Sequence, residues 1–235
     1  MLDFSRFKWL SFDCYGTLID WETGLLGHLR SLFQAKGCRL NDAQILALYS
    51  EFEPREEAGH YRTYRDVLAS VVRDFARELH FEVDDYEAAG LAESIRDWQP
   101  FPDTVPGLQR LHSRYKLAVL SNIDDDLFAY TAPKLKVPFD GVVTAQQVHS
   151  YKPSLNNFEA LLRRHAIPRE RLLHVAESLF HDVAPAHKLG ITTVWVNRRQ
   201  GKAAAASKPA DVKPDLEVPG VGRLAELAVP TEKRS

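Results

Sequence analysis

Cysteine is scarce in this sequence: the 235 residues contain two, Cys14 and Cys38. Two thiols in a chain of this length do not make a disulfide framework, which argues against a small disulfide-stapled secreted scaffold. The first ten residues, MLDFSRFKWL, carry acidic and basic side chains close to the start and have no small-residue cleavage site. That pattern differs from a signal peptide, so we expect a cytoplasmic protein.

Long apolar runs and an excess of one charge are also missing. No apolar run approaches the roughly 20 residues that a membrane-spanning helix needs. The formal net charge is −2, which provides no electrostatic footprint for nucleic acid or an anionic membrane. We therefore expect neither as a partner, whereas the 45% hydrophobic content suits a globular protein with a substantial core.

The stretch WLSFDCYGTLID, residues 9–20, organises the rest of the chain. An apolar run ending at Phe12 predicts a buried strand. Asp13 follows at once, where burying a carboxylate is costly unless it has a task. Gly16 then permits an unusual backbone turn. A carboxylate at the carboxyl end of a strand lies at the ligand-binding edge of an open α/β sheet, although a capping Asp before a plain turn would give the same local pattern.

From residue 20 to about residue 100 the periodicity is helical. Four helices are predicted: Glu22–Lys36, one starting at Asn41 or Asp42, Tyr61–Leu79, and one from Asp84 or Asp85 to near Trp98. Pro100 and Pro102 mark the end of this region.

After residue 103 short strands alternate with helices. Strands are predicted over 116–121, 140–144, 172–176, 192–197 and 215–218, and helices over 104–115, 124–135, 154–165, 179–189 and 221–227. Residues 200–214 are predicted to form a surface loop. Such alternation predicts a parallel sheet with helices on both faces. The fold class is therefore α/β, with residues 1–19 and 101–235 forming the sheet domain and residues 20–100 an all-helical insertion.

Residues 9–20 resemble the first motif of the haloacid dehalogenase superfamily, hhhhDxYGTLhD, and the resemblance extends from Phe7 to about Leu227. It implies a Rossmann-like, doubly wound parallel sheet with a helical cap subdomain inserted directly after that motif. Asp13 then corresponds to the covalent nucleophile. The resemblance also implies that Thr17 helps to hold the Asp13 carboxylate.

Two further motifs match the superfamily. Ser121 and Asn122, at the end of the strand KLAVLS, correspond to residues that bind the reacting group, although a Ser-Asn pair could instead cap the following helix. Lys152 stands in the sequence YKP, where the superfamily places a lysine that points at the nucleophile. An ammonium there would hold Asp13 ionised. Most lysines, by contrast, are solvated surface residues.

The fourth motif lies in HVAESLFHD, which contains Glu177, Ser178 and Asp182. In the superfamily, metal-dependent phosphatases carry an acid pair at this spacing that binds magnesium, whereas metal-independent dehalogenases usually carry Ser and Asn with one acid. This chain is closer to the phosphatase pattern. A magnesium site, if the enzyme used one, would consist of Asp13, Glu177 and Asp182. Asp182 could instead be a plain helix-surface acid, but its position in the fourth motif favours the site.

Tyr15 bears on the reaction class. The superfamily's phosphatases place a second aspartate at this position, where it protonates the leaving alkoxide. A phenol, with a pKa near 10, is a poor proton donor at neutral pH. Chloride, bromide and iodide leave without protonation, so the missing acid costs a dehalogenase little. The D-x-Y-G-T pattern is also typical of 2-haloacid dehalogenases.

The sequence therefore predicts a metal-independent hydrolase that resembles the type II 2-haloacid dehalogenases, acts on carbon–halide bonds and needs no cofactor. Asp13, Thr17, Lys152 and Asp182 are the expected catalytic residues. The expected substrate-binding residues are Tyr15, Ser121, Asn122, Glu177, Ser178 and Arg62. Arg62 is expected to hold the halide, and Arg55 and Arg65 are the other two arginines considered for that role.

Two alternatives remain. One is a Mg²⁺-dependent phosphatase or phosphonate hydrolase, which Glu177 and Asp182 favour. The other is a non-catalytic binding protein with the same fold. The expected partner is a small-molecule substrate, and a symmetric homodimer is the commonest assembly for such a protein.

Overall fold

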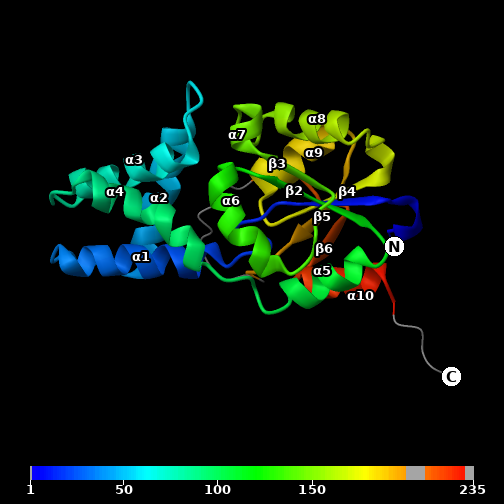
Figure 1. Cartoon of the computed structure of the whole chain (residues 1–235), viewed down its shortest axis with the longest axis horizontal. Helices are drawn as coiled ribbons and strands as arrows, with labels where there is room; N and C mark the ends of the chain where they lie inside the picture. The colour runs from blue at the N-terminus through cyan, green and yellow to red at the C-terminus, as the bar shows by residue number, and fades with distance from the viewer. Residues whose placement is uncertain (1, 200–209, 231–235) are drawn as a thin grey trace.

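Figure 1 shows the computed structural model of the chain, which describes residues 2–199 and 210–230. An α/β part containing the sheet lies on the right of this view, and a group of four helices, α1 to α4, extends from its left edge. No helix among the described residues is long and apolar enough to cross a membrane.

A single sheet of six parallel strands forms the centre of the α/β part. The strands are β1 (Trp9–Phe12), β2 (Lys116–Ser121), β3 (Gly141–Thr144), β4 (Leu172–Ala176), β5 (Thr192–Val196) and β6 (Leu216–Val218). Their spatial order is β3-β2-β1-β4-β5-β6. The direction of strand addition reverses between β1 and β4, and such a switch point opens a crevice at the carboxyl ends of the strands.

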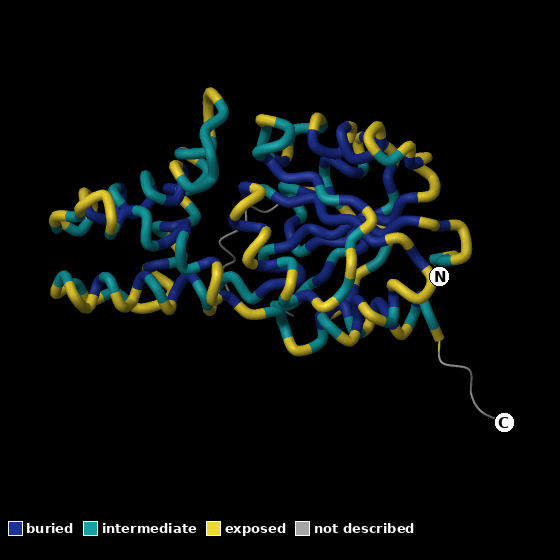
Figure 2. Tube along the Cα trace, viewed as in Figure 1, coloured by how far each residue is buried: buried dark blue, intermediate teal, exposed yellow. Residues whose placement is uncertain are grey.

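Helices cover both faces of the sheet. They are α5 (Thr104–His112), α6 (Asp125–Thr131), α7 (Ala145–Val148), α8 (Leu155–Arg164), α9 (Ala184–Lys188) and α10 (Val221–Ala228), with the π-helical turn η5 (Leu179–Val183) before α9. Helices α5 and α10 pack together on one face, and α8 and α9 on the other. The strands between them are buried almost throughout, as Figure 2 shows, because a parallel sheet is covered on both sides.

The remaining helices form the group that we call the helical unit. It comprises α1 (Trp21–Ala35), α2 (Asp42–Glu57), α3 (Tyr64–Glu78), α4 (Asp85–Ser94) and the 3₁₀ turn η2 (Ile95–Asp97). Side-chain caps begin these helices: Asn41 and Asp84 each form a capping box, and Asp20 and Thr63 accept from the first turn. Within residues 13–115, all of which are described, the only β pairings are isolated bridges.

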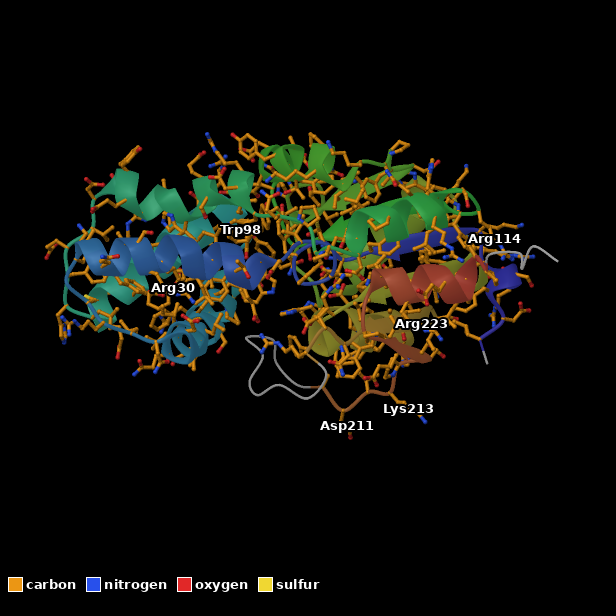
Figure 3. All side chains as sticks on the ribbon, turned by 90° about the horizontal axis from the view of Figure 1, so that it is seen from below. Arg30, Trp98, Arg114, Asp211, Lys213 and Arg223 are labelled. Atoms are coloured by element: carbon orange, nitrogen blue, oxygen red, sulfur yellow. The ribbon has the colours of Figure 1, made fainter. Side chains whose placement is uncertain are left out.

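The chain enters and leaves the helical unit at adjacent points. The Asp20 amide donates to the Gln99 carbonyl at 2.9 Å, and the Phe101 amide donates to the Leu18 carbonyl at 3.1 Å. Farther along the junction, the buried Asp124 carboxylate accepts hydrogen bonds from the first amides of α3, at Tyr64 and Arg65. Trp98, labelled in Figure 3, lies toward this junction, whereas Arg30 lies on the helical unit. These contacts hold the helical unit over the carboxyl ends of the strands.

The predicted α/β class and parallel sheet are confirmed. Two predicted helices are interrupted: the segment 124–135 changes to a 3₁₀ turn at Ala132, next to Pro133, and the segment 179–189 begins as a π turn. Helix α7 was not predicted, since four residues are too few to show a period. Residues 200–209 of the predicted loop lie outside the described residues.

Candidate active site

Asp13 lies where the sequence pattern puts it, directly after β1 at the switch point of the sheet. It is buried, and its Oδ2 accepts a hydrogen bond from the Thr17 hydroxyl at 2.8 Å. Gly16, with φ of 96°, makes the tight turn that returns Thr17 toward Asp13. Thr17 also accepts from the Glu177 amide at 2.9 Å, so one hydroxyl joins the loops after β1 and β4.

Lys152 connects two buried carboxylates. Its ammonium donates to Asp13 Oδ1 at 2.8 Å, to Asp182 Oδ1 at 2.7 Å and to the Leu120 carbonyl at 2.9 Å. Burial alone would lower the pKa of Lys152, but the charges of Asp13 and Asp182 outweigh this and raise it. The ammonium therefore stays protonated and provides the fixed positive charge of the site.

The two carboxylates respond differently to this charge. Burial raises the pKa of Asp182, but Lys152 and the hydrogen bond with His174 outweigh it and bring that pKa to about 2. Burial is also the largest effect on Asp13 and raises its pKa, while Lys152 and Thr17 act in the opposite direction. Asp182 is thus held ionised, and Asp13 is the more basic of the two carboxylates.

His174 is a member of the site that sequence reasoning missed. It is fully buried in β4, with Nε2 at 3.0 Å from Asp182 Oδ1 and Nδ1 at 2.8 Å from the Ser11 hydroxyl. Because an ionised carboxylate only accepts, this network assigns the hydrogen to Nε2 and lets Nδ1 accept from Ser11. His174 therefore holds the Asp182 carboxylate in place by a hydrogen bond from β4.

The motif after β2 positions Lys152. The Asn122 side chain accepts from the Lys152 amide at 2.7 Å and donates to the Lys152 carbonyl at 3.1 Å. The oxygen and the nitrogen of the Asn122 side chain thus both bind the backbone of Lys152. Asn122 therefore positions the lysine more than it binds a ligand. Ser121 is buried at the cavity. Ser178 accepts from the His181 amide at 3.0 Å and caps the turn η5.

Glu177 brings a third carboxylate to the cavity. Its amide binds Thr17 and its carbonyl accepts from Trp195 Nε1 at 2.7 Å, so its backbone is fixed. Burial and the charges of Asp13 and Asp182 raise the pKa of Glu177 to about 7, with Arg198 acting in the opposite direction. Glu177 therefore changes its charge near neutral pH.

The cavity at this place has a volume of about 110 Å³. It is lined by Asp13, Tyr15, Trp21, Tyr49, Glu53, Tyr64, Ile95, Trp98, Ser121, Asn122, Ile123, Lys152, Glu177, Ser178, His181 and Asp182. The aromatic residues come from the first loop and the helical unit, and the polar ones come mainly from the strand ends. A pocket for a drug-sized ligand is typically about 300–1,000 Å³, so this cavity suits a much smaller molecule.

Comparison with known proteins identifies the family. A model of the haloacid dehalogenase-like hydrolases matches residues 10–196, which include β1 apart from Trp9, β2 to β5 and the whole helical unit. The chain belongs to this family. Its resemblance to the first motif of that superfamily is thereby confirmed.

Several named proteins are similar to this haloacid dehalogenase-like hydrolase. The (S)-2-haloacid dehalogenase of Pseudomonas putida is 22% identical over 221 residues, covering 93% of this chain and 95% of the relative. Glyceraldehyde 3-phosphate phosphatase of Methanothermobacter thermautotrophicus is 33% identical over 132 residues, 55% of this chain and 57% of the phosphatase. The L-2-haloacid dehalogenase of Xanthobacter autotrophicus shares the fold, with a TM-score of 0.79 at 20% identity over 96% of this chain and 99% of that one.

The metal site that a phosphatase of this superfamily would need does not fit these residues. Asp13 Oδ1 and Asp182 Oδ1 both face the Lys152 ammonium, and Thr17 occupies Asp13 Oδ2. Magnesium requires an octahedron of oxygen ligands at about 2.0–2.1 Å. In the part of the chain that the structure describes, no three acidic, His or Cys side chains come together as a metal-binding group. Asp13, Glu177 and Asp182 are therefore not assigned to a metal.

The arginines considered for halide binding lie elsewhere. Arg62, expected at the substrate, is not among the cavity residues: its guanidinium binds Glu56 and the Ser70 hydroxyl. Arg55 pairs with the buried Asp74, and Arg65 with Glu93 and Asp126. Each guanidinium is held by a carboxylate outside the cavity, so Arg62 is not carried into the proposed site.

Proposed function

We propose that this chain hydrolyses short 2-haloacids to 2-hydroxy acids, with Asp13 as the covalent nucleophile. An Asp13 carboxylate oxygen forms a bond to C2 of the substrate, and the carbon–halogen bond breaks with its electron pair leaving on the halide. Water then attacks the carbonyl carbon of the resulting ester. The ester bond breaks, the product oxygen takes one water proton, the second proton goes to solvent, and the Asp13 carboxylate is regenerated.

The residues around Asp13 suit these two steps. Lys152 balances the negative charge that moves onto the ester carbonyl oxygen when water attacks. Asp182, with its pKa of about 2, is better suited to orienting Lys152 than to accepting a proton from water. Asn122 holds the backbone of Lys152, and Ser121 offers its hydroxyl to the substrate. The small cavity accords with a substrate of a few carbon atoms.

The observation that carries the proposal is the state of Tyr15. Burial raises the pKa of this phenol well above its ordinary value, and its hydroxyl lies 2.8 Å from Thr131 Oγ1. A leaving alkoxide would find no proton donor at this position, whereas a halide needs none. The 22% identity to the Pseudomonas putida enzyme over nearly the whole chain supports the same reaction.

The direct test measures halide release from 2-chloropropionate and chloroacetate, with p-nitrophenyl phosphate as the competing substrate class. We expect chloride release that is unchanged after treatment with EDTA and unchanged when Mg²⁺ is added, because Lys152 supplies the charge that a metal would. Hydrolysis of the phosphate ester should stay at background. Chloride release that disappears with EDTA and returns with Mg²⁺ would move the protein to the metal-dependent branch, and hydrolysis of the phosphate ester above background would move it to the phosphatases.

Replacing Tyr15 by phenylalanine tests the assignment of that residue. We expect kcat for chloride release within about threefold of the wild type, since a phenol of raised pKa holds its proton too tightly to act as an acid and a halide needs none. We also expect a loss of about 1 kcal/mol in the free energy of unfolding from the broken hydrogen bond. General acid catalysis is worth about 10²- to 10⁴-fold, so a loss in that range would restore Tyr15 as an acid.

We further propose that residues 20–100 act as a cap over the catalytic residues of the core, residues 1–19 and 101–235. The aromatic cavity residues of the helical unit support this division. Location in the cytoplasm is in keeping with two free cysteines, one of them buried. Assembly into a symmetric homodimer stays a prediction.

A further inference from the structure

The cavity presents a 2-haloacid with an electrostatic difficulty. Such a substrate carries its own carboxylate, and the cavity already contains Asp13, Asp182, Glu177 and Glu53. Among the described residues no arginine lines it, and the Lys152 ammonium is already shared by two carboxylates. A second anion placed beside Asp13 therefore needs a partner other than a spare cation.

Glu177 is placed to be that partner. It lines the cavity on the β4 side, and its carboxylate, one oxygen of which lies 3.7 Å from the position a Cβ would take on Gly16, faces the loop that carries Asp13. No hydrogen bond or ion pair joins this carboxylate to another described residue, although its backbone is held at both ends. Glu177 is half-buried, and a carboxyl group withdrawn from bulk water normally finds a donor or gives its proton to an acceptor.

We propose that the Glu177 carboxyl group, in its protonated form, donates a hydrogen bond to the carboxylate of the bound 2-haloacid. This hydrogen bond between Glu177 and the substrate rests on the proposed function for one point, that the ligand is a short carboxylate. It takes the place of a guanidinium: the proton lies between two carboxyl groups, so the pair carries one negative charge instead of two. The proton comes from solvent when Glu177 is ionised before binding.

The charges around Glu177 determine the direction of the effect. Asp13 and Asp182 favour its protonated form, and Arg198 opposes it. Arg198 is itself engaged by the Thr17 carbonyl and Asp103. The cavity, and the depression beside it that Glu177 shares, are also lined by other charged or titratable groups: Tyr15, Asp20, Glu22, Tyr49, Glu53, Tyr64, Lys152, His181 and Arg199. A bound anion adds one more negative charge and shifts Glu177 further toward protonation.

Affinity for the anion should therefore depend on pH in one direction. Glu177 is mostly protonated below pH 7 and binds the anion without cost. Above pH 7 a proton must be taken up, so Kd should rise by about tenfold per pH unit. A cation that loses its charge at high pH would give the same slope only if it titrated near neutrality, and Lys152 does not because its pKa is raised.

The experiment measures calorimetric binding of 2-hydroxypropionate, the product anion, so that no turnover is needed. Titrations at pH 8 in two buffers of different ionisation enthalpy count the protons taken up. We expect about one proton per anion for the wild type, and about none for Glu177→Gln, whose amide is a permanent neutral donor. The Gln variant should also bind with a Kd that is constant from pH 6 to 8.5.

Asp13→Asn is the matched control. It removes the other cavity acid whose pKa is raised but keeps Glu177. Without the Asp13 charge the pKa of Glu177 falls, so Glu177 is more fully ionised in the free protein at pH 8, and proton uptake on binding should remain near one. Uptake that persists in Glu177→Gln, a Kd that does not change with pH in the wild type, or no binding of the anion would each overturn the inference. Proton-linked binding in a wild-type protein that releases no halide would instead refute the proposed function and leave the assignment of Glu177 standing.

Discussion

Asp13→Asn is expected to reduce halide release by at least about 10⁴-fold, because an amide oxygen does not displace a halide from saturated carbon. The fold should survive the change. In the wild type, Lys152 faces two carboxylates, so this buried group carries a net charge of −1. The Asn variant leaves Lys152 with Asp182 alone, a balanced pair, so we expect the free energy of unfolding to fall by less than about 1 kcal/mol.

Three measurements separate this result from simple unfolding. Circular dichroism and thermal melting report the fold, and chloride release reports the chemistry. Mass spectrometry of the wild type, stopped during turnover with 2-chloropropionate, should detect a covalent adduct on the peptide that contains Asp13. The same peptide of the Asn variant should carry none. Near-normal halide release by the variant, or an adduct elsewhere, would remove Asp13 from its assigned role.

The sheet could be predicted from the sequence because its strands are short apolar runs with sharp ends. The predicted ranges 116–121 and 172–176 coincide with β2 and β4. Interruptions inside helices were harder to predict. Pro133 lacks an amide hydrogen and lies where α6 changes to a 3₁₀ turn. The helical spacing of apolar residues nevertheless continues past Pro133, so the sequence does not show the interruption.

The candidate-site residues that have motif neighbours could also be predicted, whereas those inside strands could not. Asp13, Lys152 and Asp182 each follow a predicted strand or stand in a distinctive turn, and the structure brings all three together. Ser11 and His174 interrupt two apolar strands at paired positions in the sheet register. That pairing was the available signal, but it becomes visible only when β1 and β4 are known to be neighbours.

Arg62 illustrates the limit of reasoning from residue type. An arginine from residues 20–100 was expected because the resemblance implies one that holds the halide, and the region contains several. Which arginine points into a cavity depends on the carboxylates nearby, and Glu56, Asp74 and Glu93 bind the three candidates. Their tertiary partners come from different helices or turns, which helical periodicity does not specify.

Lys152→Met should have the largest combined effect on stability and activity. It leaves Asp13 and Asp182 buried and facing each other without the cation between them. Removing one partner of a buried ion pair costs about 3–5 kcal/mol, and we expect a loss of that size in the free energy of unfolding, measured by urea denaturation. Halide release should fall by at least about 10³-fold, because repulsion raises the pKa of the carboxylates and the ester carbonyl loses its counter-charge.

A double-mutant cycle between Lys152 and Asp13 tests whether the Lys152 ammonium allows Asp13 and Asp182 to be buried together as charged carboxylates. In the wild-type background, Asp13→Asn should change the free energy of unfolding little. In the Lys152→Met background, the same substitution removes one of two unpaired buried charges, so it should stabilise the protein by about 1–3 kcal/mol. The sign of the Asp13→Asn effect thus reverses with the residue at position 152. Equal effects in both backgrounds would mean that the Lys152 charge is not what holds Asp13 ionised, and the electrostatic account of the nucleophile would fail.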